Sequence, residues 1–166
     1  MDIDGICSPF RFDGAVRQAI HQLKYRNVKA LAAPLAQLMG EYLMRSPLPV
    51  EVLVPVPLHP RRLRQRGYNQ ASLLARELAK IGLIPLVEGV LIRLHDTPAQ
   101  TRTQSAEERQ NNVARAFFCR GREFEGKRIL LIDDVCTSGA TLDACATALK
   151  AAGAASVWGL TVAREV

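Results

Sequence analysis

The sequence predicts an α/β fold in which a mainly parallel central sheet is flanked by helices. Three observations lead to this prediction. Apolar residues recur every three to four positions in several segments, which is typical of amphipathic helices. Short aliphatic runs, of which residues 129–132 are the clearest, alternate with these segments and suit strands that are buried on both faces. Proline, glycine and polar residues separate the two kinds of segment, as expected of turns.

The chain has 166 residues, of which 48% are hydrophobic and 23% charged, and this composition fits one folded domain. Its apolar runs are too short to cross a bilayer, and residues 1–5 lack the basic and apolar parts of a secretory leader. We therefore expect a cytoplasmic protein that does not enter a membrane. The four cysteines are scattered without a Cys-x-x-Cys pair, so neither a zinc site nor a disulfide framework is expected.

Two consecutive helices are predicted within residues 12–45, where apolar residues recur at helical spacing. Asp13 is the expected cap of the first helix. We expect residues 1–46 to form an N-terminal helical region that packs on a core of residues 47–166, within one compact domain overall. Residues 24–26, the basic corner between the two helices, are interpreted as an exposed connection.

Residues 50–58 are predicted to be a strand that runs into a constrained turn. Its pairing should end at Pro55 and Pro57, which cannot donate to a ladder. A basic turn follows, which contains Arg61, Arg62, Arg64 and Arg66. Arginines beside the end of a strand suit an anion such as pyrophosphate, and a solvated basic loop is the alternative. The net charge of +6 would draw in an anionic substrate or nucleic acid, and charge alone does not choose between them.

The middle of the chain contains a long polar stretch, residues 95–112. Ser105 and Glu108 have the spacing of a capping box, so a short helix is predicted to begin there. We interpret the whole stretch as a mobile lid that closes over a charged substrate, in preference to a passive linker. The other predicted elements are a helix over 70–81 capped by Asn69 and ended by Gly82, strands over 86–94 and 113–119, a helix over 141–152 and a final strand over 156–162.

The most informative stretch is residues 128–141. The predicted strand 129–132 leads into two adjacent acids, Asp133 and Asp134, then into a loop of small residues and a helix that begins near Thr141. Backbone N–H groups of such a loop and the positive end of a helix dipole can hold a phosphate. The acids can accept hydrogen bonds from sugar hydroxyls or hold a hydrated Mg²⁺. Together these features predict a sugar-phosphate site.

Other interpretations of this stretch fit less well. The chain has no Gly-x-Gly-x-x-Gly, so the dinucleotide-binding fingerprint is missing. Residues 121–128 come close to a Walker phosphate loop, but they end in Arg128 instead of Ser or Thr and precede a strand. A further alternative is a buried strand whose two acids merely cap a turn. This alternative does not explain why two carboxylates directly precede a phosphate-shaped loop. A catalytic thiol at Cys136 is not favoured, because a phosphate loop works through its backbone.

Residues 128–141 resemble the phosphoribosyl pyrophosphate (PRPP) signature of type I phosphoribosyltransferases. Four separate segments, in the expected order, resemble the ComF-like (competence protein F or GntX-like) family of these proteins. They are Leu23-Lys-Tyr; Val54-Pro-Val-Pro-Leu-His with Arg66-Gly-Tyr-Asn-Gln; Arg93, Gln104, Arg109 and Asn112-Val-Ala-Arg-Ala-Phe; and the signature itself. Members usually begin with a cysteine-rich zinc segment, of which only Cys7 remains near the N-terminus here, so no zinc site is carried over.

The resemblance implies a type I phosphoribosyltransferase fold with a mobile hood loop, which binds PRPP and Mg²⁺. It also implies transfer of the phosphoribosyl group to an unidentified nitrogen nucleophile, with release of pyrophosphate. The implied PRPP contacts are Asp133 and Asp134, with Mg²⁺ near both, and Val135, Cys136, Thr137, Ser138, Gly139, Ala140 and Thr141. Pyrophosphate is expected at Pro57, Leu58, Arg61 and Arg62, and the hood loop at Gln104, Arg109 and Asn112.

A non-catalytic protein that binds PRPP or a nucleotide is the alternative, for example in competence-related DNA uptake. In that case the arginines at positions 61–66 would contact DNA phosphates. An acid pair and an intact Thr-Ser-Gly-x-Thr turn are features that DNA binding alone does not need. The chain is also a candidate for a homodimer.

Overall fold

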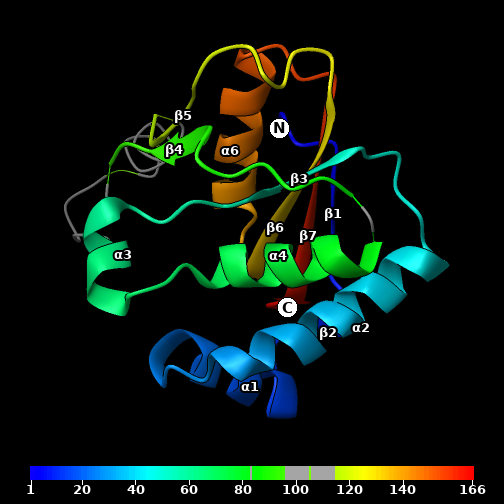
Figure 1. Ribbon diagram of the computed structural model, residues 1–166, viewed down its shortest axis with the longest axis vertical. Helices are drawn as coiled ribbons and strands as arrows, with labels where there is room; N and C mark the ends of the chain where they lie inside the picture. Colours follow the sequence, from blue (N-terminus) through cyan, green and yellow to red (C-terminus); the bar gives the residue numbers. More distant parts are fainter. Residues whose placement is uncertain (83, 96–104, 106–114) are drawn as a thin grey trace.

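The computed structural model describes residues 1–82, 84–95, 105 and 115–166. A parallel sheet with the strand order β1-β7-β6-β3 lies at its centre, and helices cover both faces of the sheet (Figure 1). This is the α/β arrangement that the sequence predicts. The described elements, in chain order, are β1 Gly5–Cys7, β2 Phe10–Arg11, α1 Gly14–Tyr25, the 3₁₀ helix η1 Lys29–Leu31, α2 Ala32–Arg45, β3 Val52–Pro55, α3 Pro60–Arg66, α4 Gln70–Gly82, β4 Leu91–Arg93, β5 Phe117–Cys119, β6 Arg128–Cys136, α6 Ala140–Ala151 and β7 Ser156–Arg164.

The central strand β6 accounts for the apolar run of the signature. It pairs in parallel with β3 on one side and with β7 on the other. Ile129 and Leu131 pack in the same apolar cluster as α6. Leu130 and Ile132 pack in the cluster that includes α2 and α4. A strand covered on both faces needs apolar residues at every position, and all four side chains are fully buried.

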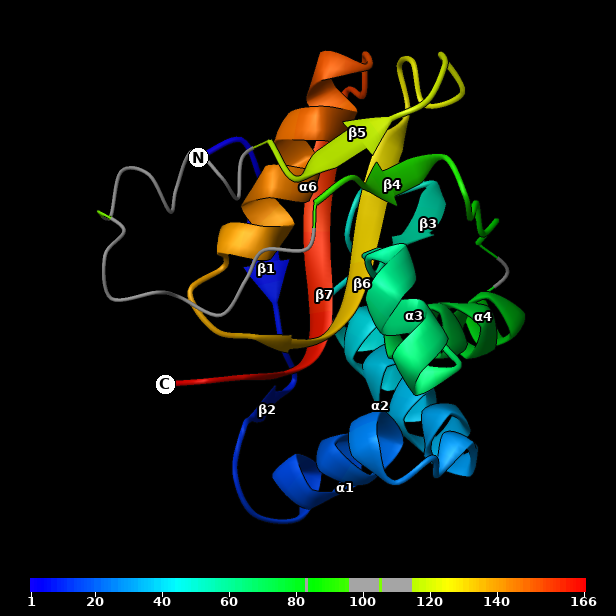
Figure 2. The same cartoon turned by 90° about the vertical axis from the view of Figure 1, so that its left-hand side faces the viewer.

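Two layers enclose the sheet. One layer consists of α6 and the β4–β5 hairpin, and the other of α1, α2 and α4. Figure 2 shows β6 and β7 side by side, with α6 on one side and the layer of α2 and α4 on the other. Among the described residues, every helix is too short or too polar to cross a bilayer.

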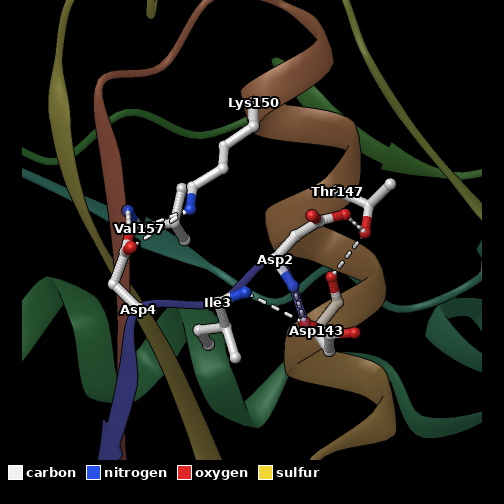
Figure 3. Close-up of polar contacts among 7 residues, drawn as sticks. All are labelled: Asp2, Ile3, Asp4, Asp143, Thr147, Lys150 and Val157. Atoms are coloured by element: carbon white, nitrogen blue, oxygen red, sulfur yellow. Dashed lines mark hydrogen bonds and ion pairs between the residues drawn. The ribbon is translucent and has the colours of Figure 1, made fainter.

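The N-terminal residues form two short strands that the sequence periodicity does not indicate. β1 and β2 both pair in parallel with β7. The residues before β1 lie along α6 (Figure 3), where the backbone N–H groups of Asp2 and Ile3 donate to Asp143 Oδ1 at 2.7 and 2.9 Å. Thr147 Oγ1 donates to Asp2 Oδ2 at 2.6 Å. The N-terminal segment is therefore fastened to the first turns of α6.

Asp4 joins the same segment to β7 and to the end of α6. Its Oδ2 accepts a hydrogen bond from Val157 N at 2.8 Å and lies 3.1 Å from Lys150 Nζ (Figure 3). The hydrogen bond from the Val157 backbone is the main cause that lowers the pKa of Asp4. These contacts hold the N-terminal segment against β7 and the last turn of α6.

The basic stretch after β3 was expected to be a turn, and that expectation is wrong. It is the helix α3, with Pro60 in its first turn and Gly67 at its end in the left-handed conformation (φ 88°). The His59 side chain caps it, since Nδ1 accepts from Arg61 N at 3.1 Å. The predicted cap of α4 is confirmed, because Ala71 N donates to Asn69 Oδ1 at 3.0 Å.

The limits of the predicted strands also differ: the strand within 50–58 covers only 52–55, and the final strand continues beyond 162 to Arg164. Of residues 86–94, only 91–93 form a strand, and this strand pairs with β5 instead of the central sheet. Leu86 makes a single bridge to Leu53. The signature strand is longer than predicted and continues through both acids to Cys136. Of the strand expected over 113–119, residues 117–119 form β5. Apart from Ser105 itself, the helix expected to begin there lies outside the described residues.

Candidate functional site

Two carboxylates lie near the end of β6, on adjacent residues. Asp133 Oδ1 accepts from Asp134 N at 2.8 Å, and Asp134 Oδ1 accepts from Val135 N at 2.9 Å. Each acid thus uses one oxygen to accept from the backbone N–H of the next residue and keeps the other oxygen for a different partner. Adjacent residues of a strand point to opposite faces of the sheet, so the two remaining oxygens meet different surroundings.

Asp134 points to the side of α1, where Lys24 is its partner. Lys24 Nζ lies 3.3 Å from Asp134 Oδ2, and the Asp134 residue is only 3% exposed. This Oδ2 is a buried oxygen without a hydrogen bond among the described residues. The interpretation of residues 24–26 as a mere exposed connection is therefore wrong for Lys24. In the sequence, the only feature that indicates a role for Lys24 is the Leu23-Lys-Tyr segment, which resembles the family.

Asp133 lies on the other side and borders the loop between β6 and α6. Burial raises the pKa of Asp133 well above its usual range, and the charge of Asp134 raises it further, while Lys24 acts in the opposite direction. Two adjacent carboxylates, with one lysine paired to Asp134, leave net negative charge at the end of β6. Hard cations bind carboxylate oxygens, so this donor set fits a divalent cation that also uses oxygens of a bound ligand.

The loop after β6 has the form of an anion site. A small cavity of about 40 Å³ lies between the loop and the strand, bordered by Asp133, Val135, Cys136, Thr137, Gly139, Thr141 and Leu142. Gly139 stands at the N-cap position of α6 with φ 84° and has no side chain to cap the helix, while Ser138 Oγ accepts from Ala140 N at 3.3 Å. The helix N-terminus thus leaves backbone N–H groups for an anion. Six of the nine signature residues predicted to contact PRPP border this cavity, and the other three are Asp134, Ser138 and Ala140.

The N-terminal segment packs against Gly139 through the side chain of Ile6. A Cβ atom at this position would lie 3.1 Å from Ile6 Cδ1, which is tighter than an ordinary van der Waals contact. Both the left-handed backbone and this close approach require glycine. Ile6 and β1 are therefore part of the support of the loop, although the sequence gives no hint of their role.

The predicted pyrophosphate residues occupy two different places. Pro57 and Leu58 follow β3 and line a hollow of about 500 Å³ together with residues of α4 and β4. Arg61 and Arg62 lie one turn further along, on the exposed surface of α3. Arg62 borders a second hollow, which also contains Lys24. The structure thus brings Arg62, but not Arg61, to the same cavity as the partner of Asp134.

The predicted hood residues, Gln104, Arg109 and Asn112, lie outside the described residues. The stretch that contains them begins and ends on the β4–β5 hairpin, where Leu94 N donates to Ala116 O at 2.7 Å. No group of three or more His, Cys, Asp or Glu residues suited to a metal occurs among the residues that the structure describes.

Residues 63–164 match the model of the phosphoribosyl transferase domain family, and the chain belongs to this family. The solved structure of glutamine PRPP amidotransferase from B. subtilis, complexed with ADP and GMP, is similar over 78% of this chain and 26% of that chain. It has 21% identity and a TM-score of 0.53. This likeness concerns the fold, and together with the family match it confirms the predicted type I phosphoribosyltransferase fold.

Curated relatives identify the branch as the ComF-like one, as the four segments predicted. Competence protein F of Haemophilus influenzae is 39% identical over 114 residues, which are 66% of this chain and 49% of the relative. Competence protein ComFC of Bacillus subtilis is 31% identical over 160 residues, 95% of this chain and 63% of the relative. The chain thus spans between about half and just under two thirds of the length of these relatives.

Proposed function

We propose that this protein binds PRPP with Mg²⁺ and transfers the phosphoribosyl group to a nitrogen nucleophile, with release of pyrophosphate. The observation that carries the proposal is the shared cavity of Asp133 and the loop before α6. A sugar phosphate needs an anion site and hydroxyl acceptors a few ångströms apart. The loop supplies the first through backbone N–H groups, and the carboxylate supplies the second.

In this proposal each part of PRPP meets a different element. The 5′-phosphate binds residues 137–141, and the ribose hydroxyls donate to Asp133. The pyrophosphate lies toward Pro57, Leu58, Arg61 and Arg62. Asp133 and Asp134 would hold Mg²⁺, which would supply positive charge to the pyrophosphate oxygens. The hood residues would cover the sugar and keep water away from it.

The reaction requires one bond to break and one to form at C1 of the ribose. The bond from C1 to the pyrophosphate oxygen breaks, and the electron pair leaves with the pyrophosphate. A bond from C1 to the acceptor nitrogen forms, and an N–H acceptor releases its proton to water. The protein's share is to hold both ends of PRPP so that C1 faces the acceptor, and to place the arginines near the charge of the leaving group.

Calorimetric titration with PRPP in the presence of Mg²⁺ tests the proposal. The wild type should bind, and the double variant Asp133→Asn with Asp134→Asn should lose binding, because amide groups cannot replace the negative charge. Asp13→Asn is the matched control, since the Asp13 side chain at the start of α1 makes no capping hydrogen bond. Absence of heat for the wild type, or equal binding by the double variant, would show that the proposal is wrong. Pyrophosphate release against a panel of bases and amines then tests turnover.

The exposed surface of α3 supports a second candidate, an accessory protein that contacts DNA. Arg61, Arg62 and Arg64 are all exposed on this one short helix, and a row of arginines is suited to DNA phosphates. Such binding should weaken steeply with salt, and Arg61→Ala with Arg62→Ala should remove much of this salt dependence. Binding that is absent, or that does not respond to salt, would exclude this candidate.

A further inference from the structure

Lys24 is placed by a buried neighbour, although it belongs to the last turn of an otherwise exposed helix end. Leu23, the residue before it, is fully buried in the apolar cluster that includes α2 and α4. The backbone oxygen of Leu23 also accepts a hydrogen bond from the Tyr68 hydroxyl. The last turn of α1 is thus anchored, and the Lys24 side chain extends from this anchored turn to β6.

Both oxygens of Asp134 are already engaged. Its Oδ1 accepts from Val135 N at 2.9 Å, and its Oδ2 lies 3.3 Å from Lys24 Nζ. This Oδ2 is buried and has no hydrogen bond among the described residues, so the ion pair is its main polar contact there. A metal ion that comes to Asp134 Oδ2 must therefore share this oxygen with the lysine or replace it.

Lys24 can leave this position more easily than Asp134 can. The lysine side chain is 26% exposed and borders the open hollow between α1 and α3. Its Nζ also lies 5.9 Å from the centre of the Tyr25 ring, which weakly attracts a cation. The ammonium can thus move into water without entering another buried place. The Asp134 carboxylate, in contrast, is nearly fully buried at the end of the central strand.

The charge of Lys24 acts on both acids. Burial raises the pKa of Asp133, the charge of Asp134 raises it further, and Lys24 opposes this rise. When both acids are ionised, the lysine leaves the acid pair with one net negative charge instead of two. The attraction of a divalent cation grows with the negative charge near it. Lys24 therefore weakens the attraction that the acid pair offers to Mg²⁺.

We propose that Lys24 is a resident counter-ion of Asp134, which competes with Mg²⁺ for this carboxylate and yields it when PRPP binds with the metal. The inference rests on the proposed function, because the competition requires Mg²⁺ at the acid pair. Lys24 is then a positioning residue that acts through Asp134. It compensates the buried charge of Asp134 before the ligand arrives, and it sets the Mg²⁺ concentration at which the site fills.

Two simpler roles of Lys24 lead to different expectations. A lysine that only stabilises the fold would affect unfolding and leave the Mg²⁺ requirement unchanged. A lysine that contacts PRPP would contribute to PRPP affinity even when Mg²⁺ is saturating. A counter-ion that competes with Mg²⁺ differs from both, because its removal lowers the Mg²⁺ requirement and hardly changes the PRPP affinity at saturating Mg²⁺.

Calorimetric titration of the full chain with PRPP at a series of Mg²⁺ concentrations tests the inference. It gives the Mg²⁺ concentration for half-maximal binding and the PRPP Kd at saturating Mg²⁺. Lys24→Gln should lower the first value by about tenfold, the order of magnitude expected for one unit charge beside a carboxylate. The second value should change by less than about threefold. The glutamine amide can still donate to Asp134 Oδ2, so this variant should fold.

Two further variants serve as controls. Lys24→Arg keeps the positive charge, so its Mg²⁺ requirement should stay within about threefold of the wild type. Lys80→Gln removes a lysine charge from an exposed pair, in which Lys80 Nζ lies 3.1 Å from Glu77 Oε1, and it should change neither value. If Lys24→Arg needs as little Mg²⁺ as Lys24→Gln, the charge is not what competes, and the inference is overturned.

The remaining outcomes separate this inference from the proposed function. If the wild type binds PRPP and Lys24→Gln needs as much Mg²⁺ as the wild type, the inference is wrong and the proposed function stands. If Lys24→Gln loses about tenfold or more in PRPP affinity at saturating Mg²⁺, the lysine contacts PRPP itself and the inference is overturned. If the wild type does not bind PRPP at any Mg²⁺ concentration, both are wrong.

Discussion

Lys24 Nζ at the end of α1 lies 3.3 Å from Oδ2 of Asp134 in the central strand β6. The two residues are far apart in the sequence, and their ion pair joins the N-terminal helices to the acid pair. Asp134 is nearly fully buried, and a buried charge is tolerated when a partner is present. The position of α1 and the charge of the candidate site are therefore coupled.

The Lys24→Met variant should destabilise the protein by about 2–3 kcal/mol, because Asp134 keeps its buried charge without a partner. This value is at the lower end for buried pairs, since the Lys24 side chain is 26% exposed. Urea unfolding measures the loss. The double variant Lys24→Met with Asp134→Asn should recover most of it, because the uncompensated charge is gone. If the double variant loses as much unfolding free energy as the two single variants together, the two residues are not coupled.

Asp133→Asn should stabilise the ligand-free protein at pH 7. The pKa of Asp133 is raised in the folded state, so its ionisation opposes folding. This penalty is absent below the unfolded pKa of about 3.9, grows as pH rises toward the folded pKa, and is constant above it. The asparagine keeps the oxygen that accepts from Asp134 N and removes the charge.

Calorimetric melting at pH 7 and at pH 4 checks this sign. At pH 7 the melting temperature should rise by about 2–4 °C for each kcal/mol of relief, and at pH 4 the gain should be smaller. A gain of equal size at both values of pH, or a lower melting temperature at pH 7, would mean that the Asp133 charge does not oppose folding.

Gly139→Ala should cost more stability than Gly121→Ala. Both positions have positive φ, 84° and 62°, so alanine pays about 1 kcal/mol or more for the left-handed backbone at each. Only at Gly139 does the new Cβ meet a neighbour, Ile6 Cδ1 at 3.1 Å, whereas nothing lies within 4 Å at Gly121. Thermal unfolding of the two variants compares them, and equal losses would show that Ile6 does not constrain the loop.

Asp143→Ala should release the N-terminal segment from α6. Its Oδ1 accepts from the backbone N–H groups of Asp2 and Ile3 (Figure 3), and loss of these charge-assisted bonds costs about 1–2 kcal/mol. Hydrogen exchange of the two amides should become faster by about tenfold or more. Thr147→Val is the control, since it removes one side-chain bond to Asp2 and leaves both amides paired. Unchanged exchange in Asp143→Ala would contradict the role of this carboxylate.

The parts of the fold that the sequence predicts are those with a local signal. The aliphatic run at 129–132 identifies the central strand because burial on both faces requires it, and helical spacing identifies α4 together with its Asn69 cap. Helix α3 has no apolar periodicity, because four of its seven residues are arginine, and this pattern predicts a turn. Pro60 in its first turn and Gly67 at its end are the local features that indicate a helix.

Contacts between distant segments were not predictable in the same way. β1 and β2 have three and two residues, which is too few for any periodicity, and they exist because β7 offers an edge for pairing. Lys24 looks like an ordinary surface residue until the fold places it beside Asp134. The acid pair and its loop were predictable because a single motif contains them, whereas the hollow between α1 and α3 combines two separate segments that only the fold brings together.

A crystal structure of the protein with PRPP and Mg²⁺ tests the central claim most directly. The account predicts the 5′-phosphate against the backbone of residues 137–141 and the ribose hydroxyls at hydrogen-bond distance from Asp133, at the end of β6. A PRPP molecule bound elsewhere, or a loop that remains empty at saturating PRPP, would contradict it.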